Sequence, residues 1–403
     1  MKFAHMADVH IGSWRDPRLK DLSIEAFIKA IEISLDNHVD FILISGDLFN
    51  TALPGIDNLK SVVKELRQLH AKKVPVYIIP GSHDFSPSGK TMIDVLEEAG
   101  LVKNVVKGTV KDDKLFLKFT VDEKTGCKIT GILGKRGSLE RHYYESLDIE
   151  HLEKEPGNKI FMFHSAIKEL MPNDFGQMDS MELSLLPKGF DYYAGGHVHI
   201  VKEFHEQDHK LIVYPGPVFP ANFSEIEKLG QGGFFIYDNG KLIREDLNVK
   251  NTFLIDIDSD HKTPQEVERA IYDMISGKQF INTIVLIKIG GKLKTGKLSD
   301  IKFKEVFERI YLQGAYFIMK NTSKVSSEEY EEIKLDEKDF EDVEDALVKE
   351  HLGQIKVKGF DAEKEYRTTK ELLQALSSEK HEGEKVYEYE DRIKKEIDKI
   401  LEL

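Results

Sequence analysis

Short apolar runs alternate with amphipathic segments over the first 100 residues of the chain. Apolar runs at 3–7, 41–45 and 74–79 predict buried β-strands. Between them, 23–37 and 56–70 carry apolar residues at three- and four-residue spacing, which predicts two amphipathic helices. The order β-α-β-α-β is typical of a largely parallel sheet with helices on both faces. In such a sheet, ligands bind beyond the carboxyl ends of the strands.

After about residue 100 the strand-like runs become shorter and closer together, which predicts a second sheet. These runs lie at 115–119, 129–133, 160–164, 192–195, 211–214 and 234–237. Two of them lead into histidines, one into His164 and the other into His197 and His199. We therefore expect these histidines to lie at the same edge as the polar residues that follow the first strands.

A third pattern begins near residue 251. It predicts strands at 253–255 and 283–289 and helices at 264–275 and 303–312, as in a small α+β domain. Beyond Asn321 the chain is mostly charged and helical in pattern. The expected domains are 1–250, 251–325 and 326–403.

The composition fits a protein without membrane segments. The chain has 403 residues, enough for two or three domains. No stretch approaches the roughly 18 consecutive apolar residues that cross a bilayer, and Asp8 comes too early for a secretory signal. Cys127 is the only cysteine, which excludes an internal disulfide and a thiolate metal cluster. We expect a cytoplasmic, nucleoid-associated protein that does not bind membranes.

The acidic charge is concentrated in the last part of the sequence. The whole chain has a net charge of -14. Residues 331–403 hold 23 acidic and 14 basic residues, whereas 251–330 hold 11 and 12. A phosphate-bearing ligand is therefore not excluded, because bound metals and local lysines set the field where such a ligand binds.

Carboxylates and imidazoles follow five of the predicted strands. The segments are Asp8-x-His10, Gly46-Asp47, Gly81-Ser82-His83-Asp84, His164 and Gly196-His197-x-His199. Each pattern alone is weak, but five at strand ends predict convergent metal ligands. Carboxylate and imidazole without thiolate suit Mn, Fe, Zn, Co or Mg. Two such ions bridged by a carboxylate catalyse in-line displacement at phosphorus, so the pattern predicts phosphoester hydrolysis.

These motifs resemble those of the calcineurin-like metallophosphoesterases, over residues 1 to about 245. The segments 2–12 and 40–50 more specifically resemble the DNA double-strand-break repair nuclease family of the meiotic-recombination-eleven (SbcD) type. The resemblance implies an α/β (α+β) fold, a two-sheet metallophosphoesterase sandwich flanked by helices. A small α+β capping domain and a C-terminal helical tail that binds a partner would follow.

The resemblance also implies roles for the strand-end residues. Metal 1 would be bound by Asp8, His10 and His199, metal 2 by His164, His197 and Ser82, with Asp47 as the bridge. His83 would be the catalytic acid that protonates the leaving sugar oxygen. Its alternative role is a hydrogen bond to the metal shell. Asp84 would orient His83 or cap the following turn.

Two positions depart from the family pattern. Ser82 stands where the family has an asparagine, and its hydroxyl is a shorter and weaker ligand than the amide. We therefore expect the second ion to bind less tightly. Asn50 stands where relatives often carry a histidine that helps to position DNA, which bears on the strength of exonuclease activity.

Candidate DNA and partner contacts lie after residue 250. A lysine cluster in the small domain is a candidate DNA contact, and a solvated surface is the alternative. The cluster comprises Lys292, Lys294, Lys297, Lys302 and Lys304. The last helix carries an apolar stripe, Val386, Tyr389, Ile393, Ile397 and Ile400. This stripe either folds back on the chain or binds a partner helix.

In the resembled family the tail binds an SMC-like coiled-coil ABC ATPase of the radiation-sensitive-fifty (SbcC) type. A second helix, with Phe340, Val343, Leu347 and Leu352, is a further candidate contact. The family also dimerises through helices that correspond to 56–70 and 91–98, which implies a homodimer within a heterotetramer.

The expected function is a Mn-dependent DNA nuclease, both an endonuclease and a 3'-to-5' exonuclease, that processes double-strand breaks with two Mn ions. Mg, Fe and Zn are the alternative metals. Two other functions remain open: a phosphodiesterase on small phosphodiesters or nucleotides, and a DNA-tethering scaffold with a weakened metal site.

Overall fold

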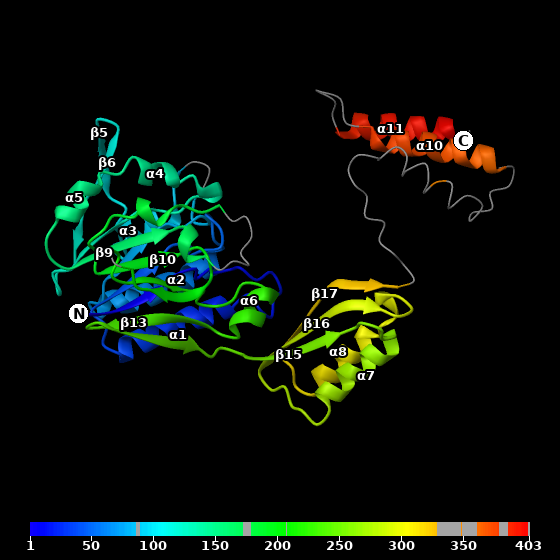
Figure 1. Cartoon of the computed structure of the whole chain (residues 1–403), viewed down its shortest axis with the longest axis horizontal. Helices are drawn as coiled ribbons and strands as arrows, with labels where there is room; N and C mark the ends of the chain where they lie inside the picture. The colour runs from blue at the N-terminus through cyan, green and yellow to red at the C-terminus, as the bar shows by residue number, and fades with distance from the viewer. Residues whose placement is uncertain are drawn as a thin grey trace. The chain divides into compact units, whose positions relative to one another are not determined.

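The computed structural model describes residues 1–85, 89–171, 179–206, 208–328, 348, 361–378 and 386–401. The chain divides into two compact units, Met1–Glu329 and Tyr330–Leu403. Most of the first unit is a sandwich of two β-sheets, and a smaller three-stranded sheet follows it in the chain (Figure 1).

The first sheet has six strands in the order β14-β13-β1-β2-β3-β4. They are β1 (Lys2–Met6), β2 (Phe41–Ser45), β3 (Val76–Ile79), β4 (Lys103–Asn104), β13 (Gly232–Asp238) and β14 (Lys241–Leu247). The strands β1, β2 and β3 run parallel, as predicted. β4, which was not predicted, pairs parallel with β3, and β13 pairs antiparallel with β1. Helices α1 (Leu22–Asp36), α2 (Ile56–Ala71) and α3 (Met92–Glu98) form a hydrophobic core with this sheet.

The second sheet has the strand order β11-β12-β10-β9-β8-β7. Its strands are β7 (Thr120–Val121), β8 (Lys128–Gly131), β9 (Lys159–His164), β10 (Tyr192–Gly196), β11 (Val201–Phe204) and β12 (Ile212–Pro215). Between the sheets, Phe3 packs edge-on against Tyr192 with ring centroids 5.0 Å apart. The predicted two-sheet sandwich is therefore confirmed.

Short helices and one hairpin complete this part of the molecule. The helices are α4 (Arg141–Glu145), α5 (Ile149–Lys154) and α6 (Phe223–Leu229), with 3₁₀ turns η1 (Arg136–Ser138), η2 (Lys168–Leu170) and η4 (Leu183–Leu185). The hairpin consists of β5 (Gly108–Lys111) and β6 (Lys114–Leu117).

Two runs assigned to the second sheet lie elsewhere. Residues 234–237 belong to β13, which returns to the first sheet and pairs with β1. Residues 115–119 overlap β6, which pairs with β5 in the separate hairpin. Both predictions were wrong because an apolar run indicates a strand but carries no information about which long-range partner it pairs with.

The smaller sheet is parallel, with strands β15 (Asn251–Asp258), β16 (Thr283–Leu293) and β17 (Phe317–Ser327). Helices α7 (Pro264–Ile275) and α8 (Phe303–Leu312) share its core, and η5 (Leu298–Asp300) precedes α8. Residues 322–327 were expected to be helical but form the end of β17, where Val325 is the only large apolar residue, so the segment shows little apolar pattern. The boundary between the first two expected domains stays a prediction.

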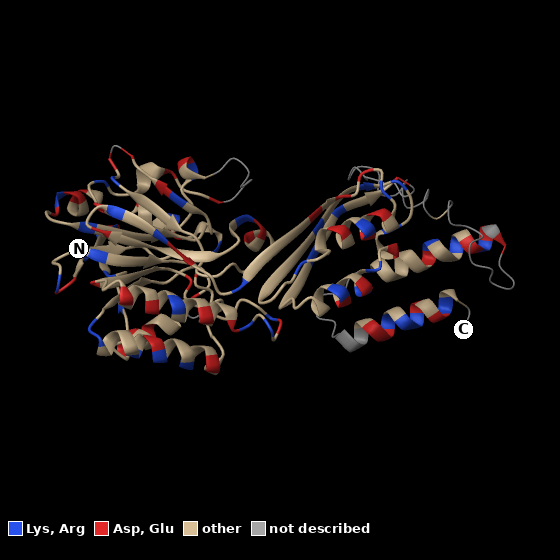
Figure 2. Ribbon diagram, turned by 90° about the horizontal axis from the view of Figure 1, so that it is seen from below, with Lys and Arg blue, Asp and Glu red and all other residues tan. Residues whose placement is uncertain are grey.

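The second unit contains two described helices, α10 (Ala362–Ser377) and α11 (Val386–Ile400). Both helices carry acidic and basic residues along their length (Figure 2). The hydroxyl of Tyr389 donates to the carbonyl oxygen of Ser378 at 3.1 Å, which joins the two helices. The candidate contacts at Phe340, Val343, Leu347 and Leu352 lie outside the described residues. None of the described helices is long and apolar enough to cross a bilayer.

Candidate metal centre

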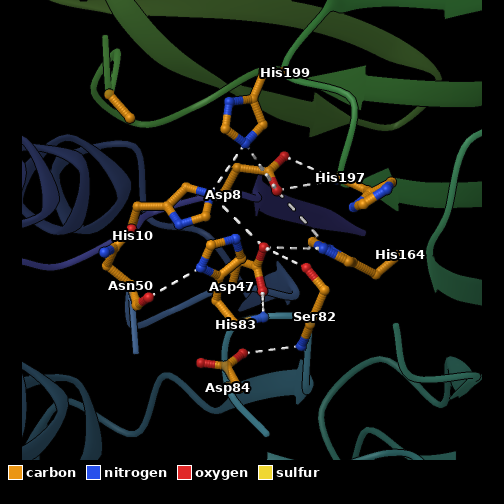
Figure 3. A network of polar contacts seen from close by, with 12 residues as sticks. Asp8, His10, Asp47, Asn50, Ser82, His83, Asp84, His164, His197 and His199 are labelled. Atoms are coloured by element: carbon orange, nitrogen blue, oxygen red, sulfur yellow. Dashed lines mark hydrogen bonds and ion pairs between the residues drawn. The ribbon is translucent and has the colours of Figure 1, made fainter. Parts of the chain in front are cut away.

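Loops from both sheets meet at one edge of the sandwich, where β1, β2, β3, β9 and β10 end (Figure 3). Backbone hydrogen bonds join the first two loops: the N–H of Asp8 donates to the carbonyl of Gly46 at 3.2 Å. The N–H of His10 likewise donates to the carbonyl of Asp47 at 2.9 Å. The predicted convergence of polar residues at this edge follows from the parallel direction of the strands.

Several residues of this edge have a left-handed backbone, which non-glycine residues rarely adopt. The φ angles are 51° for Asp8, 46° for His10, 51° for Asp47, 94° for His197 and 50° for His199. Each such residue costs roughly 1–3 kcal/mol, and such strain clusters at functional sites. The surrounding hydrogen bonds therefore maintain a loop geometry that local propensity does not favour.

Asp8, His10 and His199 form the first ligand group, with one ligand atom of each within 4.8 Å of the others. The two Nε2 atoms of the histidines lie 3.0 Å apart, and Nε2 of His199 lies 3.7 Å from Oδ1 of Asp8. Burial lowers the pKa of His10 to about 3, so its imidazole is neutral, which is the form that binds a metal. Buried Nδ1 of His10 has no hydrogen-bond partner among the described residues.

Asp47 and His164 lie at the centre of the second group. Nε2 of His164 lies 3.2 Å from Oδ2 of Asp47, and Nδ1 of His164 donates to the carbonyl of Ser45 at 2.8 Å. This second bond fixes the ring with Nε2 directed at Asp47, as in histidines that bind metals. The ring of His197 lies next to that of His164, with centroids 5.1 Å apart. The hydroxyl of Ser82 donates to Oδ2 of Asp47 at 3.4 Å.

The position of Asp47 connects the two groups. Its Oδ2 lies 3.7 Å from Nε2 of His10, in addition to its contact with His164. Burial alone would raise the pKa of Asp47, but His164 and His10 lower it well below its usual range. The carboxyl is therefore ionised. The pKa of Asp8 is raised by burial, a cost that a bound cation would offset.

The donor set fits divalent metal ions. Buried Nδ1 of His10 has no hydrogen-bond partner among the described residues, and Nε2 of His164 faces Oδ2 of Asp47 at 3.2 Å. An unpaired buried nitrogen is rare in proteins and here lies among carboxylates. Carboxylate and imidazole together are the ligands that Mn, Fe, Zn and Co prefer.

His83 lies directly beside Asp47. Its backbone N–H donates to Oδ1 of Asp47 at 2.7 Å, and its Nδ1 contacts the carbonyl oxygen of Asn50 at 2.9 Å. Because the second contact occupies Nδ1, Nε2 is the ring nitrogen that can interact with a ligand or a substrate. The backbone of Asn50, and not its side chain, thus orients His83.

Asp84 binds backbone and not His83 in the described contacts. Its carboxylate accepts hydrogen bonds from the N–H groups of Gly81, Phe49 and Leu48 at 2.9, 3.1 and 3.4 Å. Burial and the nearby charge of Asp47 raise the pKa of Asp84 to about 7. These contacts join the preceding Gly81 to the loop after β2, so the described contacts confirm neither expected role of Asp84, orienting His83 or capping the following turn.

Glu225 at the start of α6 is a site residue that the sequence interpretation missed. Its Oε1 lies 3.0 Å from Nδ1 of His199. The spacing of Asn222 and Glu225 is a helix-start signal, and Asn222 caps α6 through the N–H of Glu225. That signal predicts a helix but not a contact with a histidine 26 residues earlier. A cavity of about 480 Å³ opens beside His199, between β11 and α6.

The lysine cluster lies away from this edge. Lys292, Lys294, Lys297, Lys302 and Lys304 are all exposed, between the end of β16 and the start of α8. Ile284 and Leu286, at the opposite end of β16, share the core of the first sheet. The cluster is thus at the end of β16 farther from the metal centre, and Lys302 pairs with Glu305 at 3.6 Å.

Residues 1–201 match the family described as calcineurin-like phosphoesterase. This part of the chain is a calcineurin-like phosphoesterase domain. The chain is therefore a metal-dependent hydrolase of phosphate esters, as the strand-end ligands predict.

Curated relatives extend the similarity beyond this domain. A DNA double-strand break repair protein Mre11 from Archaeoglobus fulgidus is 26% identical over 343 residues, 77% of this chain and 74% of the relative. The protein of the same name from Methanocaldococcus jannaschii is 28% identical over 306 residues, 73% of this chain and 77% of the relative. A third, from Saccharolobus solfataricus, is 29% identical over 245 residues, 59% and 60% of the two chains.

Proposed function

We propose that this phosphoesterase is a Mn-dependent DNA nuclease that processes double-strand breaks with two metal ions. The observation that carries the proposal is the position of Asp47, whose Oδ2 lies 3.7 Å from His10 and 3.2 Å from His164. One carboxylate therefore faces both ligand groups, as a bridge between two ions requires. The relatives named as double-strand break repair proteins support DNA as the substrate.

Metal 1 would be bound by Asp8, His10 and His199, whose ligand atoms lie within 4.8 Å of one another. Metal 2 would be bound by His164, His197 and Ser82, with Asp47 shared. Bound divalent ions supply charge neutralisation for the phosphate and acidify a water for attack. The protein contributes a buried, ionised Asp47 and a neutral imidazole of His10. Against the effect of burial, Asp47 and Asp8 raise the pKa of His164 to about 10 and that of His199 to about 9, so these two rings would release a proton when a metal binds.

The protein also supplies the proton for the leaving group. In its protonated form His83 would donate the proton on Nε2 to the sugar oxygen as the bond to phosphorus breaks. The carbonyl oxygen of Asn50 accepts from Nδ1 of His83 and keeps the ring in this orientation. The backbone N–H of His83 donates to Oδ1 of Asp47, which keeps His83 next to the proposed bridging carboxylate. Both endonuclease and 3'-to-5' exonuclease cleavage use the same step.

The substrate class is tested by comparing end-labelled single- and double-stranded DNA with a small chromogenic phosphodiester, with and without millimolar Mn. We expect Mn-dependent cutting of DNA, at internal sites and from the 3' end. Hydrolysis of the small diester alone would favour a phosphodiesterase on small substrates or nucleotides. DNA binding with neither hydrolysis would favour a tethering scaffold whose metal site Ser82 has weakened.

The small domain and its lysines are proposed to contact DNA outside the metal centre. All five lysines are exposed, which supports contact with a phosphate backbone.

The second unit is proposed to bind the coiled-coil base of an SMC-like ABC ATPase of the radiation-sensitive-fifty (SbcC) type. Ile393 in the predicted stripe of α11 is only 9% exposed, because α10 covers part of that stripe. On α10, Leu376 is 58% exposed and Leu373 also lies at the surface. The exposed apolar side chains of the helix pair therefore provide a surface for helix-in-groove binding.

A homodimer is proposed to form through α2 and α3. Leu53 and Ile56 at the start of α2 and Val95 on α3 are large apolar side chains that lie exposed in this chain. Sedimentation of the chain alone should give a dimer, and Ile56→Glu should give a monomer with unchanged hydrolysis of the small diester. A wild-type monomer would exclude this arrangement.

A further inference from the structure

Glu225 is held in one orientation by contacts on both of its carboxylate oxygens. Oε1 lies 3.0 Å from Nδ1 of His199 and also accepts from Nδ2 of Asn222 at 2.5 Å. Oε2 accepts from the backbone N–H of Ala221 at 2.8 Å. The side chain of Glu225 is only 17% exposed, so water has little access to compete for these hydrogen bonds. The contacts with Asn222 and Ala221 thus fix the carboxylate independently of its contact with His199.

The contact determines which nitrogen of His199 faces the metal centre. A carboxylate on Nδ1 keeps the proton there and leaves the lone pair of Nε2 directed at the ligand group. Nε2 lies 3.0 Å from Nε2 of His10 and 3.7 Å from Oδ1 of Asp8. Without Glu225, the ring of His199 would have no described partner on Nδ1 and would be able to turn about its side-chain torsions.

The helix that carries Glu225 is in turn attached to the small domain. Lys288 on β16 contacts Oε1 of Glu227 at 2.6 Å, two residues after Glu225 on α6. The same ammonium group lies 3.6 Å from Asp256 on β15. The side chains of Glu227 and Lys288 are 20% and 33% exposed, so this pair is partly protected from solvent. The position of α6 therefore depends on the small domain.

We propose that Glu225 is a positioning residue for His199. We also propose that Lys288, through its contact with Glu227 on α6, stabilises the position of Glu225. The small domain would then influence the affinity of one ligand group, Asp8, His10 and His199, and leave the other group unchanged. This inference rests on the proposed two-metal function. It assigns to β16 a role in metal binding that is separate from any contact with DNA.

The first test measures Mn binding to the full-length chain by calorimetry and by electron paramagnetic resonance. Glu225→Ala should lower the affinity of one of the two ions by about 10- to 100-fold, the usual effect of removing such a partner. Glu225→Gln, which keeps an acceptor oxygen, should recover part of that loss. Glu203→Gln on the exposed face of β11 is the matched control and should bind both ions as the wild type does.

Two results separate this inference from the function on which it rests. If the wild type binds two Mn ions and Glu225→Ala binds both with unchanged affinity, Glu225 has no positioning role. If the wild type binds no Mn, the two-metal function itself fails. Nitrogen NMR of the metal-free protein gives an independent readout, because loss of the contact on Nδ1 should change the chemical shifts of the ring nitrogens of His199 in Glu225→Ala and not in Glu203→Gln.

The second test is a double-mutant cycle between Lys288→Met and Glu225→Ala. Lys288→Met alone should weaken the same ion several-fold and should weaken it no further when Glu225 is already alanine. Fully additive effects would show that Lys288 acts independently of Glu225 and would overturn the coupling. Lys324→Met, at an exposed position of β17, is the matched control for loss of a lysine from the small domain. Equal unfolding temperatures of the variants establish that the loss of affinity is not a loss of fold.

Discussion

Replacement of Gly46 by alanine should disrupt the metal centre, because the added methyl group would collide with His164. Gly46 has a φ of 87°, and a Cβ atom placed on it would lie 2.2 Å from Nδ1 of His164. That nitrogen donates to the carbonyl of Ser45 at 2.8 Å, so the methyl group and the hydrogen bond compete for the same space. Gly46→Ala therefore forces His164, a proposed ligand, out of position.

The expected size of the effect follows from two terms. A left-handed backbone costs an alanine about 1–2 kcal/mol. Loss of the buried hydrogen bond of His164 adds about 1–3 kcal/mol, so the free energy of unfolding should fall by about 2–5 kcal/mol in total. Gly100 is the matched control: its φ is 71°, but nothing lies within 4 Å of an added Cβ. Gly100→Ala should cost only the backbone term, about 1–2 kcal/mol.

The assay is urea unfolding of both variants, followed by a Mn titration of the folded proteins. Gly46→Ala should be less stable than Gly100→Ala and should bind one Mn ion about 10- to 100-fold more weakly than the wild type. Gly100→Ala should bind Mn as the wild type does. Equal stabilities within about 0.5 kcal/mol, with equal Mn affinities, would refute the argument that Gly46 leaves space for His164.

Three further predictions concern other parts of the molecule. Ser82→Asn should raise the affinity of the second Mn ion, because the longer amide reaches farther than the hydroxyl; an unchanged affinity in calorimetry would mean that Ser82 is not at that ion. Burial lowers the pKa of His5 to about 3, so its folded state stays neutral while the unfolded chain is protonated below about 6.5. Stability should therefore fall as the pH drops from about 6.5 to 3, and His5→Asn should reduce that slope by about 1.4 kcal/mol per pH unit in chelator-treated protein; an unchanged slope would contradict this. Replacing all of Lys292, Lys294, Lys297, Lys302 and Lys304 with glutamine should flatten the salt dependence of DNA binding by up to about five counterions while leaving hydrolysis of a small diester intact, and an unchanged salt slope would remove these lysines from the interface.

Periodicity predicted the positions of most elements well. The run 41–45 corresponds to β2, and the predicted helices 264–275 and 303–312 correspond to α7 and α8. These segments have strong local signals: Thr263 and Glu266 form a capping box before α7, for example. The partner of each strand was harder to predict, as β13 shows, because pairing depends on contacts between distant segments.

The candidate site was predictable in its ligands but not in its supporting contacts. Asp8, His10, Asp47 and His164 stand directly after strand-like runs, so the topology of a parallel sheet brings them together. Glu225 lies after a different strand, and its contact with His199 depends on the path of a loop. The left-handed backbone of Asp8 and Asp47 was likewise not predicted, because aspartate adopts this conformation more often than most residues but at only a small fraction of its positions.

The most direct test is single-turnover cleavage of end-labelled DNA in millimolar Mn by the wild type and His83→Ala, with Mn binding measured on the same preparations. We predict that the wild type cuts DNA and that His83→Ala binds two Mn ions but cuts about 10²- to 10⁴-fold more slowly. Equal cutting by the two proteins would contradict the role of His83 as the acid. No cutting by the wild type, even after Ser82→Asn, would contradict the two-metal nuclease itself.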